Sequence, residues 1–308
     1  MALCLGLFKV GGQTPYGQPY GEKYRRAIAK EIAYGKEEEM VGMVYVKDQP
    51  RLGPESFSND SEGNLYVCDG VNQRIQIFSP NGKHESTIFL EKGVRASDIA
   101  VDRFGFIYVY DAQGKLYQYD RKGNLLRTID VDSSRWQVRM AMHMVGGNIY
   151  IRNVDQEDVL IGKVIKGVLT APTTEELAQP PEKGIHGSSG RRYILTLLRW
   201  QKGVVEILDT SGTTVNIEMP IKDIVSTTFL REDNQGNFYI QTERVEDSKI
   251  ALEVHKFDAQ GNLLTVIPIP DTNYSTWTIK LLSLDDEGNI YQFLPGKEKA
   301  QLNVFQPE

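Results

Sequence analysis

Histidine is the residue type in this sequence whose spacing first suggests chemistry. The chain has four histidines, and two of them, His143 and His186, each stand four residues before a glycine of a recurring turn, Gly147 and Gly190. Two imidazoles in the same register of neighbouring repeat units could bind a metal ion. A metal site needs three or four converging ligands, and no third ligand accompanies these two. We therefore expect hydrogen-bonded histidines between two units, with no metal and no cofactor.

Carboxylates also recur at a constant place, in Asp60, Asp102, Asp233 and Asp285. Calcium requires six to eight oxygen ligands around one point, whereas each unit has one such aspartate at the start of a turn. Aspartate in that place accepts backbone hydrogen bonds, so we expect turn capping. The sequence has no nucleophile elbow, phosphate-binding loop or paired-cysteine motif, and no catalytic residue is predicted.

These turns belong to an internal repeat that organises the chain. Its pattern is Asp, two variable residues, Gly, often Asn, an apolar residue, Tyr and another apolar residue. The glycines of its six copies are separated by 42 to 52 residues and are Gly63, Gly105, Gly147, Gly190, Gly236 and Gly288. Repeats of about 40 to 45 residues are typical of propeller blades.

Each copy predicts two β-hairpins. Glycine at the end of the turn takes the positive φ of a tight hairpin, and successive apolar residues after it indicate a strand buried on both faces. In four copies a second turn follows, as at Asn81-Gly82 and Lys122-Gly123. Two hairpins make four strands, so we expect an all-β fold, a six-bladed β-propeller of four-stranded antiparallel blades.

One blade resembles a known family. From Asp69 to Phe78, Asp69 closes a strand, Asn72 lies in a loop and Arg74-Ile75 opens the next strand. This resembles the NHL-repeat signature and implies a six-bladed NHL-type propeller from about residue 50 to residue 308. The second blade has Lys115 in place of the arginine. Calcium-dependent lactonases and zinc-dependent lyases resemble this fold, but neither ligand set can be placed on this chain.

The two ends of the chain should close the ring. Residues 301–306 correspond to the third strand of the last blade, and we expect residues 40–46 to supply the fourth. Upstream, Tyr24, Ala27, Ile28 and Ile32 have helical spacing, which predicts a short amphipathic helix. A cap on the propeller is favoured over a spacer from a membrane anchor. The expected division is an N-terminal tail, 1–39, and a propeller, 40–308. Residues 1–8 are either the remnant of an export signal or a disordered end.

Loops between blades, and between the second and third strands of a blade, should emerge on one face. Trp, Tyr and Arg dominate recognition interfaces, and all three tryptophans of the chain fall in these loops. The candidate binding residues on this face are Arg95, Asp98, Trp136, Arg139, Trp200, Tyr274, Trp277 and Lys280.

Composition and charge exclude some classes of function. Hydrophobic residues are 40% of the chain, which suits a folded protein, and the net charge of −6 disfavours a nucleic-acid partner. Two cysteines, Cys4 and Cys68, leave the compartment open, and an extracytoplasmic location is favoured. We expect a monomeric, noncatalytic binding module for a protein, carbohydrate or small molecule, with the membrane reached only through a signal or anchor. The alternative is a propeller enzyme, a metal-dependent lyase or hydrolase acting at the central channel.

Overall fold

The computed structural model describes residues 23–308 except 49–50, 112, 133–137, 154, 199–201, 220–221 and 271. The prediction for residues 1–8 lies outside this part of the chain. No helix among the described residues is long and apolar enough to cross a membrane.

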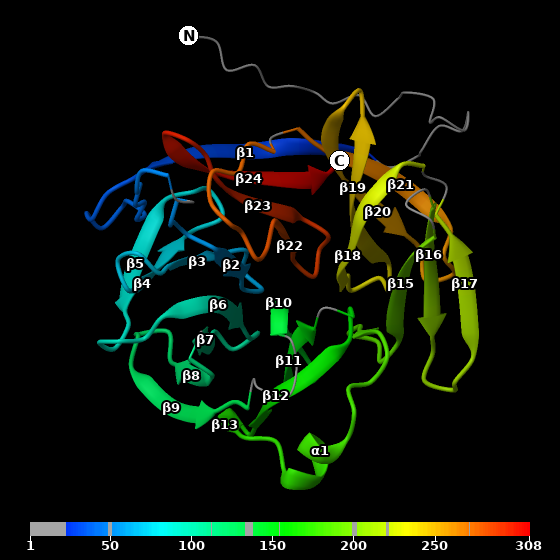
Figure 1. Ribbon diagram of the computed structural model, residues 1–308, viewed down its shortest axis with the longest axis horizontal. Coiled ribbons are helices and arrows are strands. Elements are labelled where there is room, and N and C mark those ends of the chain that lie inside the picture. Colours follow the sequence, from blue (N-terminus) through cyan, green and yellow to red (C-terminus); the bar gives the residue numbers. More distant parts are fainter. Residues whose placement is uncertain are drawn as a thin grey trace.

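Six four-stranded antiparallel sheets are arranged around a central axis (Figure 1), which confirms the six-bladed β-propeller. The first two blades contain β2 (Ser56–Asn59), β3 (Leu65–Asp69), β4 (Arg74–Phe78) and β5 (His84–Phe89), then β6 (Ala96–Val101), β7 (Ile107–Asp111), β8 (Lys115–Tyr119) and β9 (Leu125–Asp130). The third and fourth contain β10 (Val138–Val145), β11 (Asn148–Asn153), β12 (Asp158–Ile165) and β13 (Val168–Thr170), then β14 (Ile185–His186), β15 (Arg192–Leu198), β16 (Lys202–Leu208) and β17 (Thr214–Glu218). The fifth contains β18 (Ile224–Glu232), β19 (Phe238–Glu246), β20 (Lys249–Phe257) and β21 (Leu263–Ile269). A short helix, α1 (Thr174–Ala178), lies in the connection from the third blade to the fourth.

The sixth blade is closed by a strand from the N-terminal side of the chain. Its sheet order is β1 (Tyr24–Ala33), β24 (Lys299–Pro307), β23 (Ile290–Pro295) and β22 (Leu282–Leu284). The register of β1 runs from Tyr24 opposite Pro307 to Ala33 opposite Lys299.

The predicted N-terminal helix is therefore wrong, because the same residues form the closing strand β1. The prediction that residues 40–46 close the ring is wrong for the same reason. Pairing with β24 satisfies a row of backbone groups that would otherwise form an open sheet edge, and this outweighs a weak helical pattern. The sheets thus begin at Tyr24, inside the segment expected to be a tail.

Residues 35–42 form the first part of the connection from β1 to the first blade, and the NHL-like signature residues hold this part. The guanidinium of Arg74 donates to the backbone oxygens of Lys36, Glu37 and Met40, each at 2.8 Å. It also donates through Nε to Asp69 at 3.0 Å. The backbone N–H of Gly42 donates to the other oxygen of Asp69 at 3.0 Å. The blade with the most complete NHL-like signature is therefore the first blade, which lies next to the ring closure.

Five of the six junctions between blades are filled by apolar side chains. Examples are Phe57 with Phe293 between the first and sixth blades, and Tyr193 with Phe229 between the fourth and fifth. The other apolar clusters join the first and second, second and third, and fifth and sixth blades. Within the described part of the chain, no such cluster joins the third blade to the fourth.

The recurring aspartates cap turns, as expected. One oxygen of Asp60 accepts the N–H groups of Glu62 and Asn64 at 2.9 Å, and the other accepts the Tyr66 hydroxyl at 3.0 Å. The repeated tyrosine thus ties the second strand to the turn that precedes it.

Candidate functional site

The loop face consists of the connections between blades and the loops between second and third strands. Strands follow one another within each antiparallel blade, so these loops share one side of the ring and the Asp-x-x-Gly turns share the other, the turn face. Of the eight candidate residues, five are described together with their side chains. Trp136 and Trp200 lie outside the described residues, and the side chain of Arg139 does too.

Asp98 and Lys280 form an ion pair. Asp98 lies in β6 of the second blade, and Lys280 lies in the connection before the sixth blade. Lys280 Nζ lies 2.8 Å from Asp98 Oδ1 and donates to the backbone oxygen of Ile99 at 2.5 Å. Asp98 also accepts hydrogen bonds from Ser56 of the first blade and from the N–H of Met142 of the third. Asp98 is only 2% exposed. This ion pair therefore joins four blades, and its charges compensate each other.

Tyr274 and Arg95 have different environments. The Tyr274 hydroxyl donates to the backbone oxygen of Leu281 at 3.2 Å and accepts from Gln292 Nε2 at 3.0 Å, so its polar end is used inside the fold. Arg95 is exposed, and its backbone N–H donates to Asp111 at 3.1 Å. Of these two side chains, only that of Arg95 extends into solvent.

Trp277 is the most exposed large apolar side chain among the described residues, at 74%. The preceding residue, Thr276, pairs with Arg51 in a parallel bridge, so the connections on either side of the sixth blade run side by side. Arg51 also donates to the backbone oxygen of Lys297 at 2.8 Å and lies 5.5 Å from the centre of the Tyr45 ring. These contacts fix the backbone around Trp277.

Other exposed apolar residues lie in the segment of Arg51, whose backbone pairs with Thr276 beside Trp277. Val44 and Leu52 form an antiparallel bridge with two backbone hydrogen bonds, of 2.8 and 3.0 Å. Tyr45 is 67% exposed and Leu52 is 53% exposed. We call Val44, Tyr45, Val46, Leu52 and Trp277 the Trp277 patch. Sequence analysis did not single out Tyr45, because residues 40–46 were expected to be the closing strand, and it did not consider Leu52.

His143 and His186 both reach one carboxylate, Asp158. His143 Nε2 lies 3.1 Å and His186 Nδ1 2.9 Å from the same oxygen of Asp158. Burial raises the pKa of Asp158, but His143, His186 and the Arg152 guanidinium together hold that pKa below its usual range. Among the described residues, no group of three or more His, Cys, Asp or Glu side chains could hold a metal ion. Asp158 was missed because it lies outside the recurring turns.

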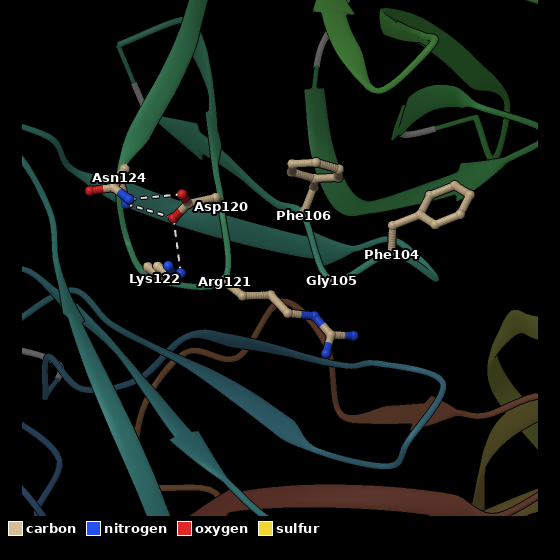
Figure 2. Close-up of a pocket in the computed structure, with 7 residues that line it drawn as sticks. All are labelled: Phe104, Gly105, Phe106, Asp120, Arg121, Lys122 and Asn124. Atoms are coloured by element: carbon tan, nitrogen blue, oxygen red, sulfur yellow. Dashed lines mark hydrogen bonds between the residues drawn. The ribbon is translucent and has the colours of Figure 1, made fainter.

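The turn face carries a shallow groove of about 330 Å³ in the second blade (Figure 2). Phe104, Gly105 and Phe106 line one side, and the turn from Asp120 to Asn124 lines the other. Figure 2 shows Asp120 accepting hydrogen bonds from within its own turn. Phe104 is 63% exposed, with the Arg103 guanidinium 4.9 Å from its ring centre. This groove offers one exposed aromatic ring, whereas Tyr45 and Trp277 give the described part of the loop face at least two.

Comparison with known proteins gives the fold. No family model matches the chain, and no curated protein matches it significantly in sequence. Among solved structures, a member of the DUF4221 family from Bacteroides vulgatus is similar with a TM-score of 0.52 and 10% identity, over 92% of this chain and 98% of that one. Virginiamycin B lyase from Staphylococcus aureus covers 92% of this chain and 99% of its own, with a TM-score of 0.47 and 10% identity. At 10% identity the likeness to the DUF4221 member shows the propeller fold alone.

Proposed function

We propose that this protein is a noncatalytic recognition module, a propeller of NHL type that binds a protein partner through its loop face. The observation that carries the proposal is the Trp277 patch. Two exposed aromatic rings and Leu52 gather there, next to a guanidinium that is already positioned. Tryptophan, tyrosine and arginine supply most of the strongest contacts in protein interfaces.

Backbone pairing within the chain already fixes the backbone of the Trp277 patch in the absence of a partner. The Arg51–Thr276 bridge and the paired Val44 and Leu52 fix both connections. A fixed surface loses little conformational entropy on binding, so more of its contact energy appears as affinity. Apolar residues exposed together in this way are typical of interaction sites.

Three of the candidate polar residues, Asp98 of β6 and Tyr274 and Lys280 of the connection before the sixth blade, use their polar groups within the ring. Lys280 and Asp98 are paired, and Tyr274 is hydrogen-bonded on both sides of its hydroxyl. A general acid or base must lie within hydrogen-bond reach of the proton that it transfers. These three groups instead support the connections that carry the patch.

Photo-crosslinking tests the proposal. A benzoylphenylalanine is placed at position 277, and in a separate variant at position 104 on the turn face, where Phe104 is similarly exposed. Irradiation in the native host should give a discrete protein adduct from position 277 and none from position 104. Adducts from position 104 alone would show that the partner binds the turn face. No adduct from position 277 would contradict a protein partner.

A further inference from the structure

The innermost strand of the fourth blade is unusually short. β14 has two residues, whereas β6, β10 and β18, the innermost strands of the second, third and fifth blades, have six, eight and nine. The chain enters β14 from the side of the third blade, because Gly184 takes a φ of +86° and Glu182 forms an antiparallel bridge with Asp158. The second strand, β15, therefore extends toward the loop face beyond its inner neighbour.

The loop-face half of β15 is exposed where the second strands of other blades are buried. Every residue of β3, β7 and β23 is buried. On β15, Ile194, Leu195 and Leu197 are only half-buried, and Leu198 is 49% exposed. Residues 194–198 include no charged residue and no proline. Charges and proline normally protect an exposed strand edge from pairing, so this edge lacks the usual protection.

The backbone groups on the inner side of β15 follow from the turn that precedes it. The N–H of Gly187 donates to the backbone oxygen of Arg191 at 2.8 Å, and residues that face the same neighbouring strand alternate along an antiparallel pair. The N–H and C=O groups of Leu195 and Leu197 therefore point to the inner side, whereas those of Thr196 point to β16. Within the described part of the chain, no backbone group pairs with Leu195 or Leu197 on that inner side.

The sixth blade shows how a short innermost strand can be completed from within the chain. Its innermost strand, β22, has three residues, and the N–H of Ser275 donates to the backbone oxygen of Pro295, at the loop-face end of β23, at 2.7 Å. In the fourth blade the ring is closed at the level of Tyr193. There the Arg152 guanidinium donates to the backbone oxygen of Phe229 at 3.1 Å, and the Phe229 ring stacks on the Tyr193 ring. The exposed half of β15 lies beyond this level, toward the loop face.

We propose that the inner edge of β15 is a binding site for an extended, uncharged peptide, which adds to the fourth blade as the missing length of its innermost strand. Leu195 and Leu197 each offer one N–H and one C=O at the spacing of a β-ladder, and strand addition draws its affinity from such groups. The side chains of both leucines pack against the apolar cluster of the fourth and fifth blades. A charged peptide side chain beside them would lose hydration against apolar neighbours.

The expected peptide therefore has apolar residues at alternate positions, because successive side chains of a strand point to opposite faces. The site lies on the fourth blade and does not involve the Trp277 patch, so the two proposals are tested separately.

Amide hydrogen exchange of the free full-length chain, followed by NMR, tests whether the edge is open. The N–H groups of Leu195 and Leu197 should exchange about tenfold or more faster than that of Thr196, which pairs with β16. Equal protection of all three groups would show that the chain itself or a second copy already covers the edge, and would overturn the proposal.

Peptide selection tests the class of ligand. A phage-displayed library of random linear peptides is selected on the full chain, and the enriched peptides are synthesised. At saturation, at least one should slow the exchange of the Leu195 and Leu197 N–H groups by about tenfold or more. Failure of every enriched peptide to protect these two groups would overturn the site. A protecting peptide with charged residues at the alternate positions would overturn the stated chemistry.

Two pairs of variants locate the binding. Leu197→Pro removes the N–H that faces the open edge and no bond to β16, while the control Leu197→Ala loses the same side chain and keeps that N–H. Leu197→Pro should weaken the peptide at least tenfold relative to Leu197→Ala. Because proline could disturb β15, Leu198→Lys provides a second variant that places a charge beside the edge. Its control is Leu126→Lys, at a similarly exposed leucine of β9.

Leu198→Lys should weaken the peptide severalfold, and Leu126→Lys should leave its affinity unchanged. Equal affinity within either pair of folded variants would overturn strand addition at β15.

Discussion

The hydroxyl of Tyr193 in the fourth blade donates a 2.5 Å hydrogen bond to Glu232, the last residue of β18 in the fifth blade. In the first, second, fifth and sixth blades, the corresponding tyrosine donates to the turn aspartate of its own blade. The fourth blade has Gly187 where that aspartate would stand. Glu232 replaces it, and also accepts the N–H of Ser189 at 2.7 Å.

Replacing Glu232 with alanine should destabilise the ring strongly. The change removes the acceptor of the Tyr193 hydroxyl and the carboxylate partner of the Arg191 guanidinium, which lies 2.8 Å from the same oxygen. We expect a loss of about 3–5 kcal/mol in the free energy of unfolding, measured by urea denaturation. Asp120→Ala is the control, because Asp120 caps an exposed turn, and should cost about 1 kcal/mol or less. Equal losses in the two variants would contradict the bridging role of Glu232.

The repeat predicted the fold because its signals are local. Gly63 has a φ of +78°, and Asp60 caps the same turn within four residues, so each hairpin can be recognised in a short stretch of sequence. Glu232 replaces a missing aspartate 45 residues earlier in the chain, at position 187, and no local pattern signals that. The closing strand was misassigned for a similar reason, since the edge that pairs with Tyr24 lies at the opposite end of the chain.

The candidate site was predicted in part. Residue type identified Trp277 as an exposed loop aromatic, but it could not distinguish Trp277 from Lys280, whose charge is paired inside the ring. Tyr45 and Leu52 join the patch through the bridge between Arg51 and Thr276. That bridge connects residues more than two hundred positions apart, so spacing along the chain gives no sign of it.

Arg74 should matter far more than its counterpart in the second blade, Lys115. The Arg74 side chain is 3% exposed and holds three backbone oxygens of the segment that connects β1 to the first blade, together with Asp69. Arg74→Ala should lower the free energy of unfolding by about 3–5 kcal/mol, because it leaves Asp69 buried without its cation. Lys115→Ala, at an exposed side chain, should change it by about 0.5 kcal/mol or less. Chemical denaturation of both variants measures the difference. A loss of unfolding free energy in Arg74→Ala as small as that in Lys115→Ala would contradict the role of Arg74 in holding this segment.

Closure by β1 can be tested at Ile32. This side chain is 3% exposed and packs in the cluster that joins the sixth and first blades, whereas its neighbour Glu31 is exposed. Ile32→Ala should cost about 2–4 kcal/mol through lost burial and the cavity left behind. Glu31→Ala should cost about 0.5 kcal/mol or less. Thermal unfolding that is the same for both variants would contradict a paired closing strand.

Acid should destabilise the protein partly through Glu253. Burial raises the pKa of the Glu253 carboxyl, but hydrogen bonds from His255 and Arg244 lower it to about 2. Because the folded pKa lies below the unfolded value of about 4.3, the stabilisation is present above that value and is lost as pH falls toward 2. The contribution is about 3 kcal/mol.

Urea unfolding between pH 6 and pH 2.5 measures this effect. Glu253→Gln should flatten the acid limb of the stability profile. Glu246→Gln, at the more exposed carboxylate that also contacts Arg244, should retain it. An unchanged acid limb in Glu253→Gln would assign the proton uptake to other groups.

The affinity for the crosslinked partner tests the recognition proposal most directly. Trp277→Ala and Tyr45→Ala should each weaken binding by about 1–4 kcal/mol, the range of interface hot spots, with the unfolding transition unchanged. Phe104→Ala, at the exposed aromatic of the turn face, should change the binding free energy by about 0.5 kcal/mol or less. Loss of affinity in Phe104→Ala together with full affinity in Trp277→Ala and Tyr45→Ala would show that the partner binds the opposite face.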